Sequence, residues 1–153
     1  MVALTLEKVD YSKITMGDLL DAVAATYPDN DALVMIDRPC HMSYRELKET
    51  CDLVAKGLIK LGVQKGEHIS IWATNVPEYV ILQFAIPKAG GVWVTVNIRS
   101  LKHEVEYLLK QSDSTTLFLV EGFRDLNYVQ MLNQLMPELA SSEPGQVRSS
   151  AFP

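Results

Sequence analysis

The chain has little of what marks several common classes of protein. Only two of its 153 residues are cysteines, Cys40 and Cys51, which favours free thiols in a reducing compartment over the alternative of a disulfide. No apolar run reaches the roughly 18 residues that a membrane-spanning helix needs, and charges within the first ten residues disfavour a secretory signal. The net charge of −5 disfavours nucleic-acid and anionic-membrane partners. We therefore expect a cytoplasmic protein with no transmembrane segment and no nucleic-acid partner.

The patterns of a self-contained active site are missing as well. The three histidines, His41, His68 and His103, fall in separate predicted elements, and none shares a short motif with a nucleophile. No His, Cys or carboxylate residues have the spacing of a metal site. None of the eight glycines belongs to a G-x-G-x-x-G or G-K-[ST] phosphate loop. We thus predict no catalytic residue and no metal site within this chain.

What the sequence does contain is a regular alternation of helical and strand patterns. Ser43 and Glu46 form a capping box before a long apolar stripe, which predicts a helix there. Continuous apolar strands that alternate with helices indicate an α/β fold: an open, mainly parallel sheet with helices on both faces, preceded by a short hairpin. The predicted helices cover 15–30, 44–61, 77–90, 100–113 and 125–139, and the predicted strands lie within 31–44 and over 67–74, 91–97 and 115–120.

The pair Gly90-Gly91 stands where a helix pattern ends and a strand pattern begins. Phosphate-binding glycines occur in the opposite order, after a strand and before a helix. We therefore predict that this pair ends the helix and lets the chain turn tightly into the strand, rather than that it contacts a ligand.

Ligands of open parallel sheets bind beyond the carboxyl ends of the strands. Three polar segments are predicted at that edge: Thr74-Asn75, Asn97–Arg99 and Glu121–Arg124. Their alternative roles are structural. Asn75 in Asn-x-x-Glu has the pattern of a helix N-cap, which we favour for it.

Two short motifs in the right order suggest a family. "MSYREL" (42–47) and "PKAGGVWVTVN" (87–97) resemble the first and second core motifs of the AMP-forming acyl-CoA synthetases, which belong to the adenylate-forming ligase superfamily. The intervening sequence is similar as well, and the resemblance runs from about Thr15 to Pro153. Later segments, such as "NYVQMLNQLMPEL", resemble the medium- and long-chain fatty-acyl-CoA ligases.

The resemblance implies a two-step reaction that uses ATP, Mg²⁺ and CoA. A fatty acid or other carboxylate attacks the α-phosphate of ATP, and the CoA thiolate then displaces AMP from the acyl adenylate. The family's Ser/Thr/Gly-rich phosphate loop and its catalytic lysine have no counterpart here. We expect the chain to be an inactive N-terminal segment of a longer synthetase, with an α/β subdomain over 1–139, a linker over 140–153 and no bound cofactor.

The same resemblance singles out three candidate binding residues. Arg99 and Arg124 fall where relatives place loops on the CoA side, and a planar guanidinium suits a phosphate. A salt bridge at a helix entry for Arg99 and a solvated loop position for Arg124 are the alternatives. Asn75 is a further candidate on the CoA or nucleotide side.

The expected partners are a fatty acid, the remainder of a synthetase chain and a second copy of this chain. Surface that the remainder would cover should be apolar, which favours a homodimer. The alternative function is a free-standing, non-catalytic binding module that reuses this fold.

Overall fold

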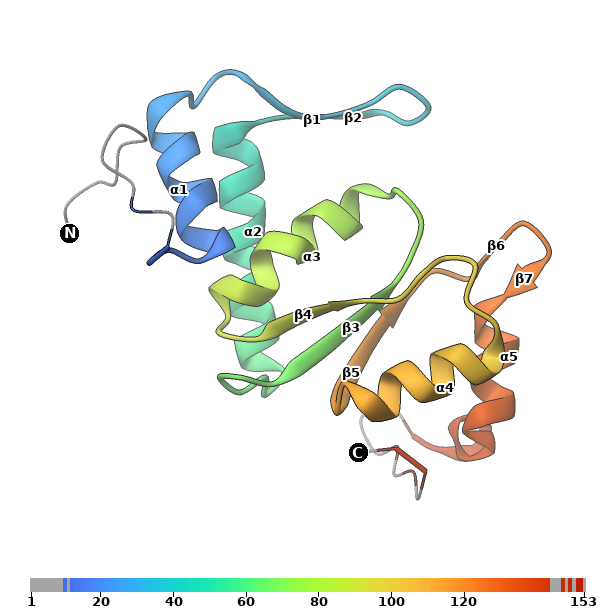
Figure 1. Ribbon diagram of the computed structural model, residues 1–153. Coiled ribbons are helices and arrows are strands. Elements are labelled where there is room, and N and C mark those ends of the chain that lie inside the picture. Colours follow the sequence, from blue (N-terminus) through green and yellow to red (C-terminus); the bar gives the residue numbers. More distant parts are fainter. Residues whose placement is uncertain (1–9, 11, 144–146, 148, 150, 153) are drawn as a thin grey trace. The chain divides into compact units, whose positions relative to one another are not determined.

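The computed structural model of the chain describes residues 10, 12–143, 147, 149, 151 and 152 (Figure 1). These residues form two compact units. The first unit consists of the chain up to Gly66 together with Asn75–Val92. The second unit consists of Glu67–Thr74 together with the chain from Trp93 onward. The helices are α1 (Met16–Thr26), α2 (Tyr44–Lys60), α3 (Pro77–Lys88), α4 (Lys102–Gln111), α5 (Tyr128–Leu135) and the 3₁₀ helix η2 (Pro137–Ser141). The strands are β1 (Asp31–Met35), β2 (Cys40–Ser43), β3 (His68–Trp72), β4 (Val92–Thr95), β5 (Ser114–Leu119), β6 (Gly122–Phe123) and β7 (Leu126–Asn127).

In the first unit, α1, α2 and α3 pack together beside the antiparallel hairpin β1–β2 (Figure 1). The predicted capping box at the start of α2 is present: the Ser43 hydroxyl accepts from the Glu46 backbone N–H, and the Glu46 carboxylate accepts from the Ser43 N–H. These contacts satisfy backbone donors that the first helical turn leaves without partners. Thr15 and Asp18 make the same arrangement at the start of α1.

A partly buried ion network joins the three helices. The Lys88 ammonium group at the end of α3 pairs with the Asp21 carboxylate of α1 and with the Asp52 carboxylate of α2, which lies 2.7 Å away. Asp52 also pairs with Lys48, one turn earlier on α2. Both cysteines are free, and Cys51 is fully buried beside this network. Burial raises the pKa of the Cys51 thiol to about 11, so it packs as a neutral side chain.

The ends of α3 bear on two of the predictions. The N-cap of α3 is Val76, without a side-chain hydrogen bond, so the prediction of Asn75 as the cap is wrong. Pro77 occupies the first helical position, and that moves the cap one residue onward from the asparagine.

At the other end of α3 the glycine prediction is confirmed. The Gly90 N–H donates to the Pro87 carbonyl, and the Gly91 N–H donates to the Ile86 carbonyl, both at 3.0 Å. This is the hydrogen-bond pattern of a Schellman cap, and Gly90 has the left-handed φ of +89° that the cap requires. The Gly90 carbonyl then accepts from the Gly66 N–H at 2.8 Å. The glycine pair therefore ends α3 and lets the chain turn into β4.

The second unit contains a three-stranded sheet with the order β4-β3-β5, in which β3 and β5 run parallel. This confirms the α/β class. A buried cluster lies among the sheet, α4 and α5, and its fully or nearly fully buried members are Trp72, Val96, Val105, Leu109 and Tyr128. The strand β3 is buried along most of its length, as its continuous apolar pattern predicts.

The segment after β5 differs from its prediction. Residues 122–127 form the small antiparallel hairpin β6–β7, and α5 begins only at Tyr128 and ends at Leu135. Within α5, Tyr128 is buried and its neighbour Val129 is exposed. The Asn127 side chain caps the helix by accepting from the Gln130 N–H, so the helix begins later than the predicted residue 125. Of the predicted linker 140–153, residues 144–146, 148, 150 and 153 lie outside the described residues.

Candidate functional site

The loop that follows β4 carries Arg99 and is a tight turn. The Asn97 side-chain oxygen accepts from the Arg99 backbone N–H at 2.9 Å, and the Asn97 carbonyl accepts from the Ser100 N–H at 3.0 Å. The Arg99 side chain is exposed and has no ion-pair partner among the described residues. The entry of α4 is stabilised instead by the Glu104 carboxylate, which accepts from the Leu101 N–H at 2.7 Å. The Arg99 guanidinium is therefore accessible to an anion.

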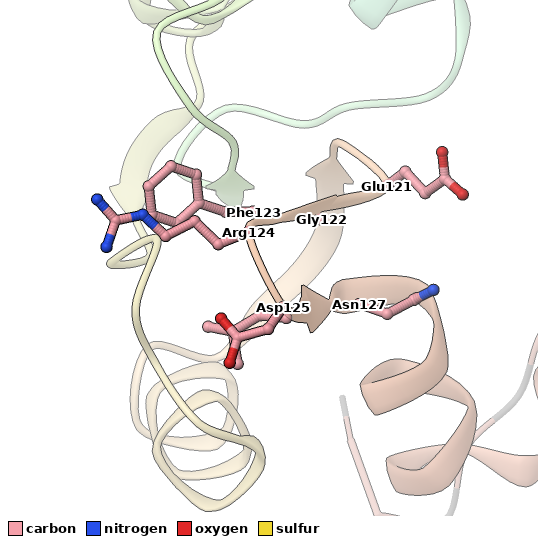
Figure 2. A pocket seen from close by; sticks show the side chains of 7 residues that line it. Glu121, Gly122, Phe123, Arg124, Asp125 and Asn127 are labelled. Atoms are coloured by element: carbon pink, nitrogen blue, oxygen red, sulfur yellow. The ribbon is translucent and has the colours of Figure 1, made fainter.

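The hairpin β6–β7 carries Arg124 at its tip. Arg124 is exposed and has a left-handed φ of +55°, which is unusual for a residue other than glycine. Figure 2 shows Arg124 and Phe123 directed to the same side of the hairpin, away from Glu121. The Arg124 guanidinium carbon lies 5.1 Å from the centre of the Phe123 ring. A shallow cavity of about 320 Å³ lies along this hairpin, and its lining consists of residues 121–127.

A pair of stacked aromatic side chains connects these two segments. The Trp72 and Tyr128 rings lie 3.8 Å apart at an angle of 12°, and both residues are fully buried. The Trp72 indole N–H donates to the Asn97 carbonyl at 3.1 Å, and the Tyr128 hydroxyl donates to the Ile98 carbonyl at 2.6 Å. The Tyr128 backbone N–H donates to the Glu121 carbonyl at 2.9 Å, at the base of the hairpin. Burial raises the pKa of Tyr128, which keeps its hydroxyl protonated as a donor.

The three candidate binding residues are thus distributed unevenly. The segments that carry Arg99 and Arg124 both belong to the second unit and share contacts with Tyr128. Asn75 belongs to the first unit, where its side chain is exposed. Trp72 and Tyr128 were not predicted to belong to the site. Two features of the sequence could have identified them: Trp72 lies near the end of a predicted buried strand, and Tyr128 directly follows Asn127, a residue type that often caps helices.

The residues present fit a phosphate better than a metal ion. Two exposed guanidinium groups on anchored segments supply donors of the geometry that phosphate oxygens accept. Among the residues that the structure describes, no group of three or more His, Cys, Asp or Glu side chains could hold a metal ion. In the same part of the chain, no helix combines the length and the apolar character needed to cross a membrane.

Comparison with known proteins gives related enzymes. The Bacillus subtilis protein YngI, provisionally assigned as an acyl-CoA synthetase, is 43% identical over 139 residues, which are 91% of this chain and 25% of that protein. The mitochondrial medium-chain acyl-CoA ligase of Mus musculus is 33% identical over 139 residues, or 91% of this chain and 23% of the ligase. The chain therefore spans about a quarter of the length of the curated relatives that it matches.

Solved structures of related enzymes agree in fold. A fatty acyl-CoA synthetase of Mycobacterium tuberculosis superposes with a TM-score of 0.65 at 27% identity, over 68% of this chain and 21% of that one. A long-chain-fatty-acid–CoA ligase of Archaeoglobus fulgidus, at 24% identity, has the same fold with a TM-score of 0.69 over 93% of this chain and 28% of the ligase. The family profile described as AMP-binding enzyme matches residues 20–150, most of the sequence. The chain accordingly belongs to the AMP-binding enzyme family.

Proposed function

We propose that this chain is the N-terminal segment of an ATP-dependent, AMP-forming acyl-CoA synthetase and that it does not catalyse adenylation alone. The observation that carries the proposal is the family match over residues 20–150, made with relatives named as acyl-CoA synthetases and ligases. In the complete reaction a fatty acid and ATP give an acyl adenylate and pyrophosphate, and CoA then displaces AMP to give the acyl-CoA.

Adenylation is needed because a carboxylate is a poor acyl donor and AMP is a good leaving group. Mg²⁺ would neutralise phosphate charge during the first step. Our proposal gives this chain two roles: a folded scaffold and cationic contacts. Arg99 and Arg124 would contact phosphate groups of CoA or nucleotide, while Asn75 is a further candidate. Medium-chain fatty acids are the proposed acyl substrates, because the mouse relative is named for them. A cytoplasmic location and a homodimer stay predictions.

The proposal is tested by replacing the aligned 139 residues of the mouse ligase with those of this chain. ATP–pyrophosphate exchange is measured with octanoate for the chimera, for the isolated chain and for the mouse ligase without its aligned segment. We expect exchange from the chimera alone among these three. The Bacillus subtilis relative, which shares 43% identity, serves as a second host if the first chimera fails to fold.

A chimera that melts cooperatively but exchanges no pyrophosphate would contradict the proposal. Exchange by the isolated chain would contradict the second half of it. If both chimeras fold without activity, the free-standing binding module becomes the better description.

A further inference from the structure

The stacked Trp72–Tyr128 pair does more than fill the core of the second unit. Each ring carries one polar hydrogen, and the two hydrogens are donated to successive carbonyl groups, those of Asn97 and Ile98. The next residue along the chain is the exposed Arg99. These two hydrogen bonds restrict the backbone at Asn97 and Ile98. If that backbone moved, the N–H and O–H groups of the two stacked, buried rings would lose their acceptors.

Tyr128 also holds the second arginine segment. Tyr128 is the first residue after β7, and its backbone N–H donates to the carbonyl of Glu121, the residue directly before β6. The loop from β4 to α4 accordingly runs beside the β6–β7 hairpin (Figure 1). One tyrosine thus contacts both the loop of Arg99 and the base of the hairpin that presents Arg124.

We infer that Trp72 and Tyr128 are positioning residues that couple the two arginine segments into one preformed anion site. Neither ring would touch the ligand. A ligand held by both segments loses less affinity to the ordering of loops when the segments are already fixed to each other. The class of ligand that fits is a phosphorylated one, and its identity as CoA rests on the proposed function.

The test uses the 153-residue chain labelled with ¹⁵N, in four forms. These are the wild type, Tyr128→Phe, Trp72→Phe and the matched control Tyr107→Phe, which removes the same hydroxyl from a tyrosine that is 68% exposed on α4. Amide hydrogen exchange reports how firmly the segments 97–100 and 121–127 are held. Titration with CoA, followed through the amide shifts of both segments, reports binding.

We expect CoA to shift both segments with one dissociation constant in the wild type. Losing the hydroxyl of Tyr128 should raise that constant about tenfold, the effect of one lost hydrogen bond, and accelerate exchange at Arg99 and Ser100 by a similar factor. Trp72→Phe should act in the same direction, whereas Tyr107→Phe should match the wild type. If Tyr128→Phe lowers the melting temperature but changes neither the dissociation constant nor the exchange rates, Tyr128 has only a structural role and the positioning role is overturned.

The two possible failures are distinguishable. If the wild type binds CoA and Tyr128→Phe binds it equally well, the positioning role is overturned while the proposed function stands. If CoA shifts neither segment of the wild type, the CoA assignment fails. Hydrogen exchange then decides on the coupling, and equal exchange rates in wild type and Tyr128→Phe overturn it.

Discussion

Lys88 and Arg124 are both cationic side chains, but Lys88 is largely buried and Arg124 is exposed. The Lys88 side chain is 10% exposed and is held by two carboxylates. Desolvation opposes the charge of Lys88, but the hydrogen bonds with Asp21 and Asp52 outweigh it and raise the pKa of Lys88. Arg124 is exposed at the tip of a hairpin. The sequence motif "PKAGG" could not reveal the ion network, because its members lie far apart along the chain and meet only in the folded state.

Removing the Lys88 charge should destabilise the protein. In Lys88→Met the aliphatic stem remains, but Asp21 and Asp52 lose their shared cation. We expect a loss of about 1–3 kcal/mol in the free energy of unfolding, reduced from a fully buried pair because the carboxylates are 45% and 32% exposed. Denaturant unfolding measures this loss. The control is Lys56→Met, an exposed lysine near the same helices, which should stay within about 0.5 kcal/mol of the wild type.

The same comparison has a defined pH dependence. Burial pushes the pKa of Asp52 upward, but hydrogen bonds from Lys48 and Lys88 outweigh it, and its pKa lies below the usual value. A lowered pKa stabilises the folded state above the pKa of the unfolded chain, about 3.9, and that contribution is lost as the pH falls. The difference between wild type and Lys88→Met should therefore shrink below about pH 4. A difference that is constant down to pH 2 would contradict the ion-pair explanation.

The left-handed backbone conformation at Arg124 is predicted to cost stability, whereas the charge of its side chain is predicted to serve binding. Arg124→Gly should stabilise the fold by about 1 kcal/mol, because glycine adopts a φ of +55° without the steric penalty of a side chain. The same change should weaken CoA binding. Arg124→Ala removes the charge but keeps the unfavourable φ, so it should weaken binding without the gain. Equal unfolding free energies for the Gly and Ala variants would refute the backbone argument.

At the scale of elements, helices with a local signal were predicted well and the rest less well. The capping box at Ser43 and the glycine turn at Gly90 each depend on a few neighbouring residues, and both are present. The hairpin β6–β7 was missed because strands of two residues are too short to show an alternating pattern. Because residues 122–127 form this hairpin, α5 begins at Tyr128 and not at the predicted residue 125.

The correction at Asn75 is directly measurable. Asn127→Ala removes a side-chain acceptor from the N-terminus of α5 and should cost about 1 kcal/mol. Asn75→Ala removes an asparagine that precedes the actual cap of α3 and should change the free energy of unfolding by less than about 0.5 kcal/mol. A cost at Asn75 as large as that at Asn127 would restore the prediction made from the Asn-x-x-Glu pattern.

The hairpin depends on one position without room for a side chain. A Cβ atom added at Gly122 would lie 2.2 Å from the Leu126 carbonyl oxygen, a backbone atom of the facing strand. Gly122→Ala should therefore destabilise the protein by about 2 kcal/mol. Gly57→Ala is the control: it meets no atom within 4 Å on α2 and should stabilise that helix by about 0.5–1 kcal/mol. Thermal unfolding should give a lower melting temperature for Gly122→Ala and a higher one for Gly57→Ala. Shifts of the same sign and size in the two variants would contradict these predictions.

At the scale of the whole molecule, periodicity and motif order predicted the class of fold and the family. The AMP-binding enzyme profile and the fold of related ligases confirm both. The site was predicted less completely. Strand ends predicted the loops that carry Arg99 and Arg124, whose role in binding stays a prediction. The Trp72–Tyr128 stack that joins these loops was not predictable. Its partners are backbone carbonyls 25 and 30 residues away in sequence, and no side-chain pattern marks a carbonyl acceptor.

The central claim is that this chain belongs to a longer acyl-CoA synthetase, and sequencing its reading frame beyond the codon for Pro153 tests it most directly. We predict that the frame continues into a Ser/Thr/Gly-rich loop that ends in a lysine, followed by the family's later ATP-binding motifs. A stop codon directly after Pro153 in the native gene would contradict the claim, and ligand or partner binding by the chain itself would then have to account for its function.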